Sequence, residues 1–323
     1  SMSEEFVLYS KQNGIATIRL NRPDKANTLR LEVIRGLDAG LAQANADDEV
    51  KVIVLEGAGD NFCGGFDFSG GLDHYGNIAE QGYDQIITVG FLLGDATAKM
   101  AAVYPDTQFA IIDFAYDPPI PNVAGIVFNV DEAAFPIGYL AAGWAALQDS
   151  ADPQVGWIGG MQIPPVEQFI VAYEAGVAYY NAVKGTNVQA KGVYVGDFEA
   201  PDEGKIQGQS LIDEGVDVIF GVGGKTGNGG IAAAKEAGKW GIGVDVDQYN
   251  TLPNEKDILI TSCMKRLDNA VFTVVESATK DEFPGGGLYI GTLENGGVGL
   301  APFHDFEGEI PAELAAEVDA IIE

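Results

Sequence analysis

The sequence predicts an α/β fold built on parallel sheets. Short apolar runs alternate with helical patterns along the chain, and Gly, Pro, Asn or Asp residues separate them. Strands that are apolar on both faces are typical of parallel sheets with helices on each side. Hydrophobic residues make up 46% of the 323 residues, which is enough to build a packed core.

The N-terminal part of the chain predicts a strand, a helix and a second strand. Ile15–Leu20 is an apolar run bounded by a glycine and by an Asn-Arg-Pro turn. Thr28 is expected to cap a helix that runs to about Asn45, because apolar residues recur there at helical spacing. Val50–Leu55 is the next predicted strand. The glycine-rich stretch over residues 64–76 predicts no element.

The remaining elements follow in regular alternation. Strands are expected at Gln85–Val89, Phe109–Asp113, Val123–Phe128, Val155–Ile158, Val188–Val195, Val218–Gly221, Trp240–Val244, Ile258–Thr261 and Leu288–Gly291. Helices are expected over residues 95–104, 131–147, 166–182, 202–213, 229–237, 267–280 and from about 311 onward. Folds of this kind bind ligands beyond the carboxyl ends of their strands, so a site is expected in the loops that follow strands.

Composition excludes several classes of function. The net charge of −30 argues against nucleic acid or an anionic membrane as a partner. No apolar run is long enough for a membrane-spanning helix, and the first residues lack the regions of a signal peptide. Two cysteines and two histidines, far apart in the sequence, supply neither a metal site nor a Ser-His triad. No metal, cofactor or catalytic residue is therefore predicted.

Three loops after strands carry candidate ligand contacts. Asp113 ends a buried strand, where its carboxylate either accepts hydrogen bonds from a ligand with paired donors or braces the loop. Phe198 follows a strand, where its ring either stacks on a planar ligand or covers the core. Gly223 and Gly224 lie in a loop whose spacing does not fit a phosphate-binding loop. Amides at the start of the next helix can still meet a ligand oxygen, and a tight turn is the alternative.

Asp245 and Lys265 follow two further strands. An Asp and a Lys in one cleft suit vicinal hydroxyl groups, because the carboxylate accepts hydrogen bonds and the ammonium donates them. A plain ion pair is the alternative. None of these loops places a nucleophile beside a base, so the sequence predicts binding rather than catalysis.

Several motifs stand in one order over roughly three quarters of the chain. They are GYDQIITVGFLLG (82–94), YPDTQFAIID (104–113), GGMQIP (159–164), GVDVIF (215–220), IGVDVDQY (242–249), TSCMKR (261–266) and GGVGL (296–300). Together they resemble the basic membrane protein family, the purine-nucleoside-receptor-like substrate-binding lipoproteins of ABC transporters.

The resemblance implies two Rossmann-like lobes of the type I periplasmic-binding-protein kind, joined by three crossovers and closing on the ligand. Lobe one is expected to comprise residues 77–128 and 262–285, with residues 1–76 completing it. Lobe two is expected over residues 129–261 and 286–323.

The resemblance also implies roles for the candidate residues. Asp113 matches the residue that reads the nucleobase edge, and Phe198 matches the one that stacks on the base. Asp245 and Lys265 match the residues that hold the ribose hydroxyls. A small-molecule nucleoside ligand and, for the natural parent, an ABC permease partner are therefore expected.

The N-terminal segment carries a second resemblance. The stretches IATIRLNRPDKAN (15–27), VIVLEG (52–57) and NFCGGFD (61–67) resemble the first third of the crotonase (enoyl-CoA hydratase/isomerase) family. Four of the five arginines also fall within the first 35 residues. The chain is therefore interpreted as a chimera, engineered or naturally fused, in which a crotonase-like segment replaces the first half-lobe.

This replacement affects the expected site. The substrate-binding family carries an aromatic residue in an Asp-Asp-Lys-Ser-Phe-Asn-like motif near its start. Residues 24–27 loosely echo that motif, which makes Asn27 a further candidate contact, whereas Ala26 supplies no ring. Because one base–aromatic stack is worth about 1–3 kcal/mol, weakened nucleoside binding is expected.

Three functions are weighed. The first is a non-enzymatic binding protein for a purine nucleoside, the second an enoyl-CoA hydratase or isomerase, and the third a chimeric fold with no retained function. The family resemblance implies an extracytoplasmic, cell-surface location for the parent protein. The lack of an export signal predicts a cytoplasmic location for this chain as expressed.

Overall fold

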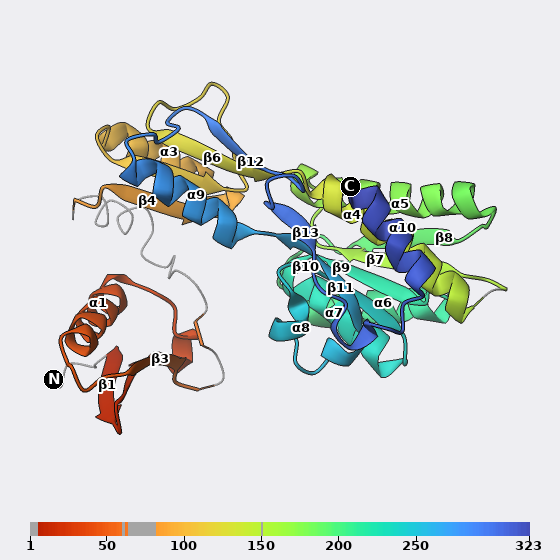
Figure 1. The fold of residues 1–323 in the computed structure, drawn as a ribbon, viewed down its shortest axis with the longest axis horizontal. Coiled ribbons are helices and arrows are strands. Elements are labelled where there is room, and N and C mark those ends of the chain that lie inside the picture. Colours follow the sequence, from red (N-terminus) through yellow and green to blue (C-terminus); the bar gives the residue numbers. More distant parts are fainter. Residues whose placement is uncertain (1–5, 60–61, 64–81, 150) are drawn as a thin grey trace. The chain divides into compact units, whose positions relative to one another are not determined.

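A computed structural model describes residues 6–59, 62–63, 82–149 and 151–323 (Figure 1). The chain divides into two compact units, residues 1–86 with 95–107, and residues 87–94 with 108–323. The glycine-rich stretch over 64–76 lies outside the described residues. Within the described ranges, no helix has the length and apolar character that crossing a membrane requires.

The first unit contains a small sheet of its own, with strand order β1-β2-β3. β1 (Val7–Gln12) and β2 (Ile15–Leu20) form an antiparallel hairpin. Its turn, Asn13-Gly14, has positive φ at both residues, the geometry that matches the twist of a hairpin. Helix α1 (Leu31–Asn45) then leads to β3 (Val52–Gly57), which pairs with β2 in parallel.

The predicted strand–helix–strand order of this unit is confirmed, with two corrections. β1 was not predicted, because the second half of this strand is polar and exposed and hides the alternation of apolar residues. Thr28 is not the helix cap, because α1 begins at Leu31 with Arg30 in the extended N-cap position. α3 (Gly94–Val103) agrees with the helix predicted there.

A four-stranded sheet has the order β12-β6-β5-β4. Its strands are β4 (Gln85–Val89), β5 (Gln108–Ile112), β6 (Val123–Phe128) and β12 (Leu288–Gly291). β6 pairs in parallel with both β5 and β12, and helix α9 (Leu267–Thr279) contacts β12. We call this sheet with α9 the four-stranded lobe.

A six-stranded sheet has the order β13-β11-β10-β9-β7-β8 (Figure 1). Its strands are β7 (Gln154–Gly159), β8 (Gln189–Tyr194), β9 (Val218–Val222), β10 (Trp240–Asp245), β11 (Leu259–Lys265) and β13 (Val298–Leu300). The helices of this lobe are α4 (Val130–Gln148), α5 (Pro164–Lys184), α6 (Pro201–Asp213), α7 (Gly224–Glu236), α8 (Gln248–Thr251) and α10 (Ala312–Ile322). We call it the six-stranded lobe.

The six-stranded sheet is buried on both faces, as the apolar runs predict. Along β7, Trp157 packs in the cluster formed with α4 and α5, whereas the next residue, Ile158, packs with Leu211 of α6 and Ile231 of α7. Because neighbouring strand residues point to opposite faces, α4 and α5 cover one face and α6 and α7 the other. The predicted α/β fold with parallel sheets is confirmed.

The chain passes between these two lobes three times, after β6, after β11 and after β12. The lobe boundaries differ from the expected ones. Residues 262–265 belong to β11 and hence to the six-stranded sheet, and Leu288–Gly291 belongs to the four-stranded sheet. The reason is local: Gly125 of β6 donates its N–H to the Gly287 carbonyl, so the glycine-rich segment before β12 leads into the four-stranded sheet. That residues 1–76 complete the four-stranded lobe stays a prediction.

Candidate functional site

Three charged side chains meet where strands of the two lobes end. Asp113 directly follows β5, and Asp245 and Lys265 are the last residues of β10 and β11. The Lys265 Nζ lies 3.1 Å from Asp113 Oδ1 and 3.5 Å from Asp245 Oδ1. Both aspartates have positive φ, 62° and 65°, a conformation that costs Asp less than most residues. The local backbone therefore aims two carboxylates at one ammonium group.

Lys265 is charged despite its burial. Its side chain is only 9% exposed, and it lies 5.2 Å from the centre of the Phe169 ring. Burial works against the charge, but Asp245 and Asp113 outweigh burial, and the pKa of Lys265 is raised. The carboxylates remain more accessible, at 25% exposed for Asp113 and 50% for Asp245. They therefore keep lone pairs for hydrogen bonds from a ligand.

Two phenylalanine rings lie close to each other and line the same cavity as these charged side chains. Phe91 opens a short 3₁₀ turn after β4, and Phe198 lies in the loop after β8. Their ring centroids are 6.5 Å apart and the planes are tilted by 60°. The loop of Phe198 is fixed by Thr226, whose N–H donates to the Phe198 carbonyl and whose hydroxyl donates to the Asp197 carbonyl.

A cavity of about 210 Å³ joins these groups. It is lined by Phe91, Asp113, Pro165, Val166, Phe169, Phe198, Val222, Gly223, Gly224, Val244, Asp245 and Lys265. Six residues singled out from the sequence are thus brought to one cavity. Gly224 is the first residue of α7, so this helix begins at the cavity.

The seventh candidate, Asn27, lies in the first unit. Its side chain is buried, accepts a hydrogen bond from the Arg22 N–H and donates one to the Ala58 carbonyl. These bonds hold the turn between β2 and α1. Its predicted role as a ligand contact stays a prediction.

Residues 35–322 match the model of the ABC transporter substrate-binding protein PnrA-like family, called Bmp. The chain belongs to this family.

Curated relatives in the family are similar at about one third identity. Basic membrane protein B of Borreliella afzelii is 32% identical over 72% of this chain and 66% of its own length. The CD4+ T-cell-stimulating antigen of Listeria monocytogenes is 33% identical over 73% and 66%. An uncharacterized lipoprotein of Pyrococcus furiosus is 33% identical over 67% and 54%. The chain therefore spans less than two thirds of the length of these relatives.

Solved structures of solute-binding proteins are also similar to this chain. The ABC transporter solute-binding protein of Aeropyrum pernix superposes with a TM-score of 0.65 at 30% identity, over 88% of this chain and 79% of that one. The solute-binding protein of Conexibacter woesei, with a TM-score of 0.60 at 19% identity over 95% and 93%, shares the fold.

The comparisons give no support to a crotonase-like segment or a chimera. The Bmp model already matches from residue 35, well inside the stretch that resembles crotonases. Residues 64–67 of the third crotonase-like stretch lie outside the described residues.

Two residues of the site in this Bmp family member were missed by the sequence analysis. Phe91 follows a predicted strand, in a loop where a site is expected, and that position was the signal for it. Phe169 lies inside α5, one turn from its start, and no loop position signals it. The site was expected to lack a second aromatic ring, because Phe91 was not recognised as a candidate.

Among the described residues no cluster of His, Cys, Asp and Glu side chains suits a metal ion. Cys263, two residues before Lys265, is fully buried, and burial raises the pKa of its thiol. A buried thiol held in its neutral form is a poor nucleophile.

Proposed function

We propose that this member of the Bmp family binds a purine-type nucleoside between its two lobes and delivers it, unchanged, to an ABC permease outside the cytoplasmic membrane. The observation that carries the proposal is the convergence of two aromatic rings, two carboxylates and one ammonium on one cavity. Each group suits a different part of a nucleoside.

The base is placed between Phe91 and Phe198. Atoms in contact lie about 3.5–4.0 Å apart, so a flat base between two rings needs ring planes about 7 Å or more apart. The ring centroids lie 6.5 Å apart at a tilt of 60°, close to that spacing. A small opening and a rotation of one ring admit the base, which hinged lobes allow.

The polar groups suit the base edge and the sugar. Asp113 lies in the four-stranded lobe beside Phe91, and its carboxylate is placed to accept N–H donors of the base edge. Asp245 and Lys265 lie on neighbouring strands of the six-stranded lobe. One accepts and the other donates, which matches a pair of vicinal ribose hydroxyls.

The charge of the cavity favours the nucleoside over the nucleotide. Two carboxylates face one ammonium, so the group carries a net negative charge. A phosphate brought against it adds two like charges in a partly dry site, where repulsion is stronger than in water. The free nucleoside is therefore the expected ligand.

Thermal unfolding and calorimetric titration with inosine, adenosine and guanosine test the proposal. At 100 times the dissociation constant a ligand adds about 2.7 kcal/mol of stability, which raises the melting temperature by several degrees. Ribose alone, the free bases and the 5′-monophosphates are the controls. No shift with any nucleoside at about millimolar concentration, in protein that unfolds cooperatively, would overturn the proposal.

A further inference from the structure

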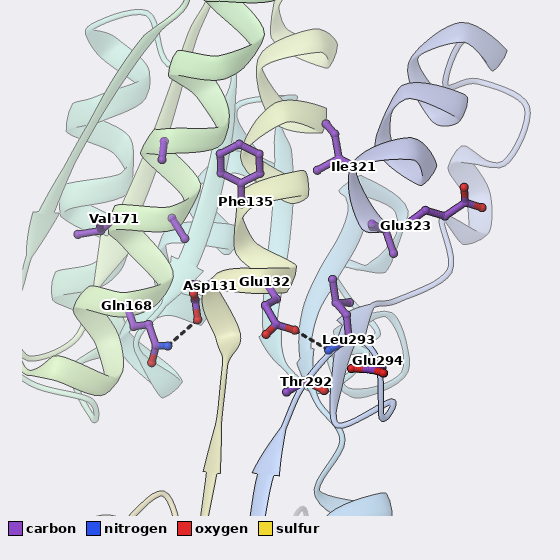
Figure 2. A pocket seen from close by; sticks show the side chains of 13 residues that line it. Asp131, Glu132, Phe135, Gln168, Val171, Thr292, Leu293, Glu294, Ile321 and Glu323 are labelled. Atoms are coloured by element: carbon purple, nitrogen blue, oxygen red, sulfur yellow. Dashed lines mark hydrogen bonds between the residues drawn. The ribbon is translucent and has the colours of Figure 1, made fainter.

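A second cavity lies away from the candidate nucleoside site. It has a volume of about 1200 Å³ and opens between the start of α4, the outer side of α5, the end of α10 and the third crossover (Figure 2). We call it the α5 groove. Small-molecule pockets typically measure about 300–1,000 Å³, so this groove has room for more than a small ligand.

The floor of the α5 groove is apolar. Phe135 of α4 and Leu293 of the crossover line it, and Val171 of α5 lies at the outer edge of the groove and points away from Phe135 (Figure 2). Val171 is 65% exposed, which is unusual for an aliphatic side chain in a cavity. Tyr179 and Val183, eight and twelve residues further along α5, are also exposed, and the Tyr179 ring lies 5.6 Å from the Phe135 ring. The apolar strip is therefore longer than the cavity.

The rim of the α5 groove is acidic. Asp131, Glu132, Glu294 and Glu323 line it, and the described lining contains no Lys or Arg. Glu294 and Glu323 are exposed. The nearest lysine on α5, Lys184, is paired with Glu313 and Glu317 of α10. The groove thus presents negative charge around an apolar floor.

We propose that the α5 groove docks a basic, amphipathic helical segment of a partner protein. An apolar strip flanked by carboxylates matches a helix with one apolar face and lysine or arginine residues beside it. The same carboxylates repel nucleic acids and anionic lipid surfaces, which leaves a polypeptide as the occupant.

The docked helix would touch the link between the lobes. Glu132 accepts a hydrogen bond of 2.7 Å from the Leu293 N–H, immediately after β12 (Figure 2). Leu293 and Glu294 of the third crossover line the groove, so a docked helix would contact them. Docking is expected to slow hydrogen exchange of the amides in this crossover, a signal that adhesion elsewhere on the acidic surface does not give.

A labelled leucine–lysine peptide of about 14 residues, near the shortest length that forms a helix, is the probe. Fluorescence anisotropy at low salt is expected to give a dissociation constant of about 10 µM for the whole protein. Ala175→Arg places a long cation in the groove and is expected to weaken binding at least about tenfold. Ala175 is exposed on α5, so the variant folds.

Ser210→Arg is the matched control, because it makes the same charge change at an exposed position of α6, on the opposite face of the six-stranded sheet. It is expected to bind the peptide within about twofold of the parent protein. Equal weakening by both variants would show adhesion through net charge and overturn the proposal. So would no binding at about 100 µM peptide, or unchanged exchange at the crossover.

Discussion

Lys265 and Asp113 lie 152 residues apart in the sequence, yet their charged groups approach to 3.1 Å. Asp113 follows a strand of the four-stranded lobe and Lys265 ends a strand of the six-stranded lobe. Their ion pair therefore links the lobes inside the candidate nucleoside site. A ligand that bonds to both residues must share them with this link, so affinity and lobe closure depend on the same atoms.

Lys265→Met tests this link. The change removes a charged hydrogen-bond donor, which is worth about 1.5–3 kcal/mol, so nucleoside affinity should fall roughly tenfold to a hundredfold. Asp113 and Asp245 are then left facing each other, but both are partly exposed, so stability should fall by only about 1 kcal/mol. Titration calorimetry and urea unfolding measure the two effects.

Lys205→Met is the control for this variant, since it breaks an exposed pair with Glu236 on α6 and α7. Its affinity for the nucleoside should match that of the parent protein. If Lys265→Met binds equally well, the ammonium does not contact the ligand.

The paired rings give a second prediction. Phe91→Leu and Phe198→Leu keep an apolar side chain but remove the stacking surface. Each is expected to weaken nucleoside binding by about 1–3 kcal/mol while leaving ribose affinity unchanged. Phe272→Leu, on an exposed face of α9, is the control. A loss at Phe198 alone would mean that Phe91 lines the cavity without touching the base.

The sequence predicted most strands and helices because their signals are local. Short, mainly apolar runs of four to six residues mark β4, β6 and β12 to the residue. The partner of each strand is not a local property. The same run at β12 fits either lobe, and its place beside β6 depends on bonds such as that from Gly125 to Gly287. The lobe boundaries therefore could not be read from periodicity.

The residues of the candidate site were likewise predictable only where their signals are local. Asp113 and Phe198 follow strands, Asp245 and Lys265 end two others, and a parallel sheet brings the ends of its strands to one edge. Phe169 lines the cavity from within a helix, where the sequence alone predicts that an aromatic residue belongs to the hydrophobic core. Its place opposite Lys265 depends on how α5 packs on the sheet, which is a tertiary property.

The third prediction concerns the crossover. Glu132 accepts hydrogen bonds from the Leu293 N–H and from the Asn129 side chain, at 2.7 and 3.0 Å. Glu132→Ala leaves both donors unpaired at a half-buried site and should cost about 1–3 kcal/mol in urea unfolding. Glu294→Ala, at an exposed position one residue beyond Leu293, should cost less than about 0.5 kcal/mol. Equal costs would show that the Glu132 bonds do not stabilise the crossover.

The packing of α10 against α4 gives a fourth prediction, which concerns the stability of the protein in alkaline solution. Tyr139 of α4 is buried, and its hydroxyl donates a 2.8 Å hydrogen bond to Glu317 of α10. Burial, and then Glu317, raise the pKa of Tyr139 to about 12. Lys184, and then Tyr139, hold the pKa of Glu317 below its ordinary value. The protonated tyrosine and the ionised glutamate therefore support each other.

Because the pKa of Tyr139 is raised from 10.0 to about 12 on folding, its contribution to stability is fully present below pH 10 and is lost as the pH rises through 12. Tyr139→Phe should be less stable than the parent protein by about 1–2 kcal/mol at pH 8, and the gap should shrink between pH 10 and 12. Urea unfolding across this range measures the gap. Tyr179→Phe, on the neighbouring helix α5, controls for removal of a hydroxyl from a half-exposed ring. A gap that stays constant from pH 8 to about 12 would mean that Tyr139 packs against α10 without its proton contributing.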